Sequence, residues 1–172
     1  MKYEEFDTKE VQKIRKRVDS DSKLLEDVIK QIINPYCKNL DEYVTFITDV
    51  LQDVGNPPTT AELEDFCMHL STDIYWASGM CERLGLKDDI SKALYKEMYN
   101  TARDNEISGT VVDKNVIAEL ASQQEYLTNV CYSRAYKIMK AKVEAAQELL
   151  GSCKKVLSHR MQEEELTRIG GK

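Results

Sequence analysis

Two long stretches of this chain carry apolar residues at alternating steps of four and three, and this pattern limits the fold most strongly. One stretch runs from Leu63 to Leu84 and the other from Tyr132 to Leu157. Heptad spacing places the apolar side chains on one face of a helix, which then packs lengthwise against a second helix. The predicted packing seams contain Leu63, Cys67, Leu70, Ile74, Ala77, Cys81, Leu84, Tyr136, Met139, Val143, Ala146, Leu150, Cys153 and Leu157.

The segment between these stretches, DNEISGTVV at residues 104–112, lacks periodicity and contains Gly109, which is typical of a chain reversal. We expect a brief extended stretch at residues 110–112. Only 7 Gly and 3 Pro occur among 172 residues, too few for a turn-dense barrel or sandwich. The sequence therefore predicts an all-α helical bundle, without significant sheet, built around a long antiparallel coiled-coil hairpin at residues 59–172.

Residues 1–58 are predicted to form an N-terminal region of two or three short helices, continuous with the hairpin. A helix over 8–33 is expected to be interrupted at residues 19–22 (DSDS) and stopped by Pro35, because proline lacks an N–H donor and restricts the residue before it. A second helix over 40–54 is expected to end at Gly55 as its C′ residue.

Other local signals divide the hairpin. Thr59 and Glu62 spell a capping box after two prolines, and we expect a helix to begin there. Gly85 is expected to end or bend that helix, with Asp88 or Asp89 capping a continuation that reaches residue 103. The last helix is predicted over 113–168, with a possible kink at the glycine of position 151.

Composition and motifs exclude several classes of protein. The net charge is −6, the five cysteines are odd in number without a CxxC pair, and the first residues do not resemble a signal peptide. We therefore predict a cytoplasmic protein whose thiols are buried apolar groups, with no metal and no cofactor. His69 and His159 lie in different predicted helices without a motif-spaced nucleophile or carboxylate, so we predict that the chain is not an enzyme.

The segment from Cys131 to Arg160 is basic, with seven basic and two acidic residues. At 100° per residue, five of its cations lie opposite the apolar seam. They are Arg134, Lys137, Lys140, Lys154 and Lys155. This face could follow a phosphate backbone, with nearby tyrosines as stacking surfaces. The alternative interpretation is a solvated coiled-coil face, because Glu144 and Glu148 lie in the same arc and Lys140 and Glu144 are spaced as an ion pair.

A resemblance adds to this interpretation. Residues 126–166, YLTNVCYSRAYKIMKAKVEAAQELLGSCKKVLSHRMQEEEL, contain the step Leu149-Leu150-Gly151-Ser152-Cys153 followed by Lys154-Lys155 and Arg160. This stretch, with the hairpin YKEMYNTARDNEISGTVVDKNVIAEL before it, resembles the C-terminal half of small phage-encoded helical proteins of the recombination-mediator (UvsY-like) type. The resemblance implies a ring-forming protein in the host cytoplasm that binds single-stranded DNA and helps to load a recombinase.

The sequence is also compatible with other functions. A helical adaptor, or an inhibitor that occupies a host protein, would need no nucleic-acid binding, because acidic helical surfaces also suit basic protein partners. An enzyme acting on a nucleotide would need a pocket built from several helices. Trp76 is either a core or interface anchor or a base-stacking group. We also predict a homo-oligomer, because the first two helices add apolar rows beyond those used in the hairpin.

Overall fold

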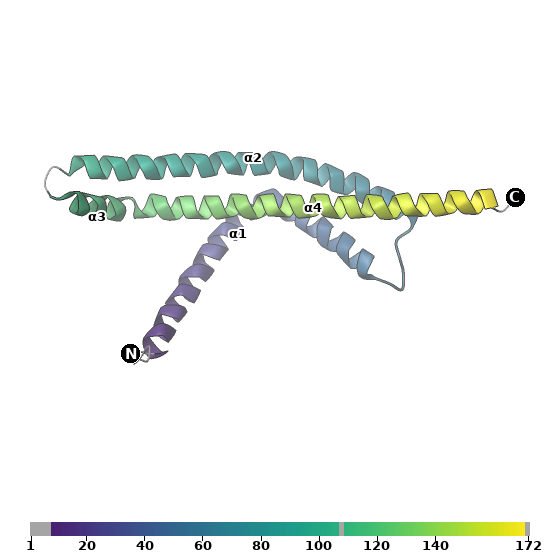
Figure 1. The fold of residues 1–172 in the computed structure, drawn as a ribbon, viewed down its shortest axis with the longest axis horizontal. Coiled ribbons are helices and arrows are strands. Elements are labelled where there is room, and N and C mark those ends of the chain that lie inside the picture. Colours follow the sequence, from purple (N-terminus) through teal and green to yellow (C-terminus); the bar gives the residue numbers. More distant parts are fainter. Residues whose placement is uncertain (1–7, 107–108, 171–172) are drawn as a thin grey trace, which may run out of the picture.

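The computed structural model describes residues 8–106 and 109–170, and within these ranges the chain is entirely helical apart from its connections. Four helices follow one another: α1 (Thr8–Gln52), α2 (Thr60–Asn105), α3 (Val111–Ala121) and α4 (Gln123–Gly170). Helices α2 and α4 lie side by side in opposite directions along much of their length, and α1 crosses them obliquely (Figure 1). The predicted all-α bundle around a long antiparallel hairpin is therefore confirmed.

Helix α1 is longer than the sequence predicted. It continues through Pro35, where we expected it to stop, so residues 8–52 form one helix in place of the short helices expected there. A proline inside a helix costs about 3 kcal/mol and commonly bends it. Pro35 itself is exposed, whereas Ile33 and Cys37 on either side are buried. Burial of the opposite face on both sides of the proline offsets the lost hydrogen bond, and α1 changes direction where it passes behind α4 (Figure 1).

The predicted interruption at residues 19–22 is also wrong, because α1 is continuous there. Serine and aspartate cost an exposed helix only tenths of a kcal/mol relative to alanine, roughly 0.5 kcal/mol each. Two ion pairs support this segment, each between residues one helical turn apart. Arg15 contacts Asp19 at 3.9 Å, and Arg17 contacts Asp21 at 3.8 Å. The local signal for an N-cap is therefore too weak to break the helix.

The connection from α1 to α2 contains two local hydrogen-bonded motifs, one after the end of α1 and the other at the start of α2. Gly55 does not act as a left-handed C′ residue, since Gly109 is the only glycine with positive φ in the described chain. The Gly55 N–H donates to Asp53 Oδ1 at 3.0 Å instead, which closes a local turn. The predicted capping box is confirmed. Thr59 Oγ1 accepts from the Glu62 N–H at 3.2 Å, and Glu62 Oε2 accepts from the Thr59 N–H at 2.7 Å.

Helix α2 neither ends nor restarts at the residues where we expected it to. It runs through Gly85, Asp88 and Asp89 to Asn105. A Cβ atom at Gly85 would lie 3.2 Å from Cε2 of Tyr136 on α4. Glycine at this position therefore makes room for an aromatic ring of the neighbouring helix and does not terminate its own.

The reversal between α2 and α3 contains Gly109, whose φ of 106° favours glycine. Thr110 is extended, but Val111 and its neighbour are already in the first turn of α3, so most of the predicted extended stretch is helical. A second capping box explains this, because Thr110 and Asp113 exchange side-chain and backbone hydrogen bonds. Part of the predicted loop, residues 107–108, lies outside the described residues.

The predicted last helix is divided in two at Ser122, which has φ −100° and ψ 11°. Its hydroxyl donates to the carbonyl of Ala118 at 2.7 Å, and both residues are fully buried. A serine that bonds back to the preceding turn commonly bends a helix. Gly151, in contrast, lies within the continuous helix α4.

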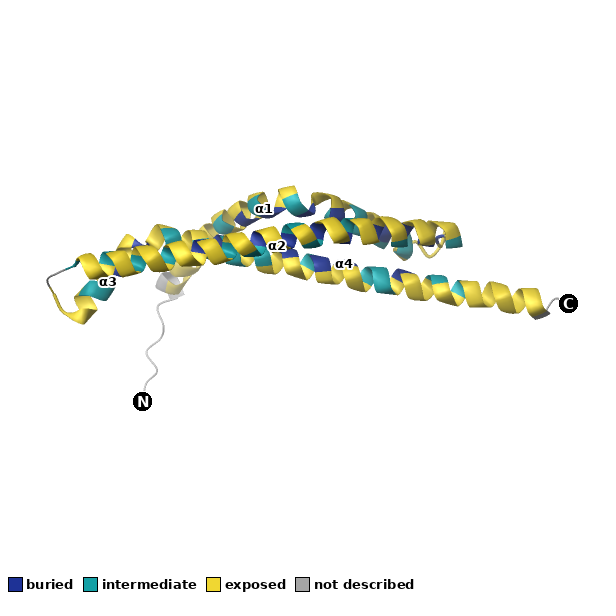
Figure 2. Cartoon of the chain, turned by 90° about the horizontal axis from the view of Figure 1, so that it is seen from above, coloured by how far each residue is buried: buried dark blue, intermediate teal, exposed yellow. Residues whose placement is uncertain are grey.

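The hydrophobic core is a single cluster that runs between α2 and α4 and includes one face of the C-terminal part of α1. Figure 2 shows the buried residues as a band along the middle of the bundle, with exposed residues toward its ends.

Polar contacts also join the helices. Lys87 on α2 donates to the Tyr36 hydroxyl on α1 at 2.8 Å, and Asn129 on α4 donates to Ser91 Oγ on α2 at 3.1 Å. Within the described ranges, no helix is both long and apolar enough to span a bilayer.

Candidate interaction surfaces

The five cations predicted as a nucleic-acid face lie along α4, and all of them are exposed. Four have no ion pair with any residue that the structure describes: Arg134, Lys137, Lys154 and Lys155. The fifth, Lys140, approaches Glu144 at 4.0 Å one turn away. Helix α4 therefore presents these cations to solvent along roughly 30 Å, at a rise of 1.5 Å per residue.

Two other basic residues of the same segment hold the fold together. Lys142 Nζ contacts Asp41 Oδ1 on α1 at 2.6 Å, with both side chains less than half exposed. The Arg160 guanidinium donates to the backbone carbonyl of Pro58, which secures the α1–α2 connection to α4. The excess of positive charge on this segment is therefore partly structural.

Acidic groups interrupt the basic face. Glu144 and Glu148 are exposed on α4 between the two groups of cations. A shallow hollow of about 250 Å³ between α2 and α4 is lined by Glu82 and Glu144 together with Lys140. The cations thus form two patches with anions between them, so a bound polyanion would meet repulsion at the centre of this face.

All fourteen predicted seam residues belong to the core cluster or pack against it. Ten of them are buried, and four are partly buried: Cys67, Tyr136, Leu150 and Leu157. The Tyr136 ring packs over Gly85, and Tyr132 is also partly buried against the core. These two rings are used in packing, whereas Tyr126 is half exposed and contacts the Tyr95 ring at 5.5 Å.

A second apolar surface was not found by the sequence reasoning. Five large side chains on the side of α2 opposite its seam are between 59% and 72% exposed. We call them the outer row: Met68, Tyr75, Trp76, Leu86 and Ile90. Met68, Tyr75, Gly79, Leu86 and Ile90 follow one another at steps of seven and four, an eleven-residue repeat that keeps them on one side of the helix. A search for an eleven-residue apolar repeat on the same helix would have found it.

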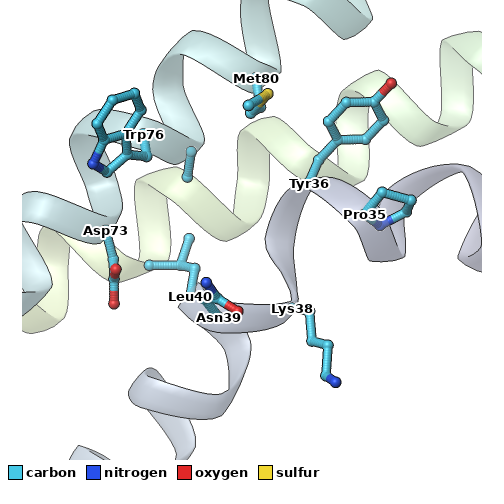
Figure 3. Close-up of a pocket in the computed structure, with 9 residues that line it drawn as sticks. Pro35, Tyr36, Lys38, Asn39, Leu40, Asp73, Trp76 and Met80 are labelled. Atoms are coloured by element: carbon cyan, nitrogen blue, oxygen red, sulfur yellow. The ribbon is translucent and has the colours of Figure 1, made fainter.

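Trp76 stands between two hollows of the surface. One, of about 230 Å³, lies in the angle between α1 and α2 and includes Tyr36, Asp73 and Met80 in its lining. Figure 3 shows Trp76 and Tyr36 at opposite ends of this hollow, with Met80 between them. The other, of about 380 Å³, lies on the outer side of α2. The Tyr75 and Trp76 rings meet edge to face with centroids 5.5 Å apart, so the two aromatic side chains form one exposed ridge.

The charges beside the outer row are mostly acidic. Residues three or four positions away from a member of the row are neighbours of that member on the helix surface. Glu64 and Asp65 stand in this relation to Met68, and Asp73 stands in it to Trp76. Glu82, Arg83 and Asp89 stand in this relation to Leu86, and Lys87 stands in it to Ile90. All of these charged side chains are exposed except that of Asp73, which is partly buried. The outer row is therefore an apolar and aromatic strip with five carboxylates and two cations along its borders.

The five cysteines are free, and all except Cys67 are buried. Burial, followed by the hydrogen bond that Cys37 donates to Asp41, raises the pKa of Cys37 to about 11. Burial also raises the pKa of the thiols of Cys81, Cys131 and Cys153.

Among the described residues no group of His, Cys, Asp and Glu side chains has a geometry that could hold a metal ion. His69 and His159 lie on α2 and α4, and His69 contacts the Tyr43 ring edge to face.

The relation to the UvsY-like mediators stays a prediction, and the geometry of α2 and α4 carries the argument about function. Comparison with protein-family models, with curated proteins and with solved structures found no match to this chain.

Proposed function

We propose that this chain is a non-enzymatic helical interaction protein that binds a helix of a protein partner along the outer row of α2. One observation carries the proposal, namely that α2 is apolar on two opposite sides and only one of them is covered in the bundle. An exposed strip of large apolar side chains bordered by polar residues commonly marks a protein-interaction site. The exposed side of α2 therefore supports a partner that covers it.

The shape of the outer row favours a helical partner. From Met68 to Leu86 it extends along a single helix for about 27 Å, at 1.5 Å per residue. At its middle a Cβ atom on Gly79 would meet nothing within 4 Å, so a partner backbone can approach closely there. Trp76 and Tyr75 supply the large side chains that dominate binding energy at interfaces, with hollows on either side to receive groups from the partner.

The borders of the row indicate the charge of the partner. Five carboxylates border the row, and they outnumber the two cations Arg83 and Lys87. Complementary potentials favour association and suppress wrong partners. We therefore infer a partner helix with an apolar face flanked by lysine or arginine.

The chain contains one tryptophan, so its fluorescence reports on the outer row directly. The probe is a synthetic amphipathic helical peptide without tryptophan, made with lysine flanks and, as a control, with glutamate flanks. Binding of the lysine peptide should shift the Trp76 emission to shorter wavelength, while the glutamate peptide should not. Glu82→Lys together with Glu64→Lys should reverse this preference.

The matched control variant is Val54→Ala, because Val54 is 93% exposed but lies outside the outer row. In peptide binding followed by anisotropy of a labelled peptide, Tyr75→Ala should weaken affinity at least tenfold and Val54→Ala should leave it unchanged. Equal affinity of the two variants, or an unshifted emission with both peptides, would contradict the proposed role of α2.

A second candidate function is binding of single-stranded DNA by the basic face of α4, as the resemblance implies. The observation that favours it is the exposure of Arg134, Lys137, Lys154 and Lys155 without ion pairs to any described residue. It ranks second because Glu144 and Glu148 lie between these cations.

Gel shift of a labelled oligonucleotide tests this second function. Arg134→Glu, Lys137→Glu and Lys155→Glu together should abolish the shift, whereas a control pair on α2, Lys92→Glu and Lys96→Glu, should not. If all five cations contact phosphates, the logarithm of affinity should fall against the logarithm of salt concentration with a slope of roughly −3.5. Unchanged binding by the triple variant would exclude this face.

A further inference from the structure

The N-terminal arm of α1, which we define as residues 11–28, leaves the bundle and projects away from it (Figure 1). Every side chain in the arm is exposed except that of Leu25, which is partly buried. The arm nevertheless carries large apolar residues, with Val11 47%, Ile14 65% and Val18 58% exposed. Helices gain most of their stability from packing of an apolar face, so a partner that covers these residues would stabilise the arm.

The apolar residues of the arm continue an interface that the bundle already contains. At 100° per residue, Val11 and Val18 lie within about 20° of Ile29 on the helix surface. Ile29 begins the buried stripe of α1, which continues through Ile33 to Leu40. The same face of one helix is therefore covered after residue 28 and uncovered before it.

The charges of the arm are divided by sign along its length. Residues 11–18 contain four cations and no anion: Lys13, Arg15, Lys16 and Arg17. Residues 19–28 contain four anions, Asp19, Asp21, Glu26 and Asp27, with a single cation, Lys23. One half is thus strongly basic and the other half acidic, with the change of sign near the centre.

We propose that the arms of two copies of this chain pack against each other in antiparallel orientation along this apolar row. Antiparallel pairing places the basic half of each arm beside the acidic half of the other, whereas parallel pairing places four cations beside four cations. It also brings Ile14 of one arm against Leu25 of the second copy. The contact uses the same patch on both copies, so it closes as a dimer with twofold symmetry.

The arm and the outer row of α2 are separate surfaces, and this dimer does not rest on the proposed function. A charge exchange in the full chain tests it. One variant has acidic residues in both halves of the arm (K13E, R15E, K16E and R17E), with Lys23 as its one remaining cation. The other has basic residues in both halves (D19K, D21K, E26K and D27K). Light scattering at high micromolar concentration measures the mass, and circular dichroism measures the helix content.

The wild-type chain should have twice the mass of one 19.8 kDa chain. Each variant alone should be a monomer, because like charges then meet along the whole arm, and an equimolar mixture of the two should again be dimeric. Ile14→Lys should give a monomer, while Trp76→Ala should leave the dimer intact.

Three results would overturn the proposal. The first is a wild-type chain that stays monomeric at high micromolar concentration. The second is a dimer formed by the basic-arm variant alone, because this would place the arm on an acidic surface such as the borders of the outer row. The third is a mixture of the two variants that stays monomeric.

Discussion

Substitution of Gly151 by alanine should stabilise the protein. Gly151 lies inside α4, and a Cβ atom there would meet nothing within 4 Å. Glycine in a helix interior is about 1 kcal/mol less favourable than alanine. With no contact to oppose this gain, Gly151→Ala should raise the free energy of unfolding by about 0.5–1 kcal/mol, which for a chain of this size raises the Tm by roughly 1–4 °C.

Two other glycines serve as controls in the same urea titration, followed by far-UV circular dichroism. At Gly85 the new Cβ would lie 3.2 Å from the Tyr136 ring, so the gain in helix propensity is opposed and the net change should be smaller. At Gly109 the φ of 106° is unfavourable for alanine, and Gly109→Ala should cost about 1–2 kcal/mol. Loss of stability in Gly151→Ala would refute the reasoning, because it would show that α4 is broken at this residue or covered on this side.

Three further measurements test the caps, the core and the thiols. Thr59→Ala removes the capping box of α2 and should cost about 1 kcal/mol of unfolding free energy in urea, with Ser at the same position as the conservative control. Met139→Ala empties a fully buried position between the helices and should cost about 2–5 kcal/mol in the same assay, and a smaller loss would contradict its burial. The thiol of Cys37 has a pKa of about 11 in the folded chain against an ordinary value of 9.0, so the unfolded chain loses this proton first. Urea stability should therefore fall as the pH rises from 9 toward 11, and Cys37→Ala should show a weaker fall.

The sequence predicted the hairpin because its signal is long and repetitive. Heptad steps from Leu63 to Leu84 and from Tyr136 to Leu157 can be satisfied only by helices packed lengthwise. The breaks were predicted less well, because each was inferred from one or two residues. The cost of Pro35 or Gly85 inside a helix is local, and burial of neighbours that are distant in sequence outweighs it.

The prediction of the candidate surfaces was limited for a similar reason, because contacts between residues distant in sequence decide which side chains are free. Nothing near Lys142 or Arg160 in the sequence shows that their partners are Asp41 and the Pro58 carbonyl, about a hundred positions earlier. Sequence reasoning therefore counted both as part of a basic segment. The sequence did not decide between a core role and a surface role for Trp76. The exposure of this side chain depends on the angle at which α1 meets α2.

The short connection between α2 and α3 has a consequence for how the chain acquires its structure. Only residues 106–110 separate the two helices, so contacts beside this turn form with little loss of chain entropy. We expect pairing to start at that end and to proceed helix turn by helix turn toward Leu63 and Cys153. The groove that receives α1 would then be completed late, so a ribosome-bound chain ending before α4 would offer its first fifty residues only the α2 side of their docking site.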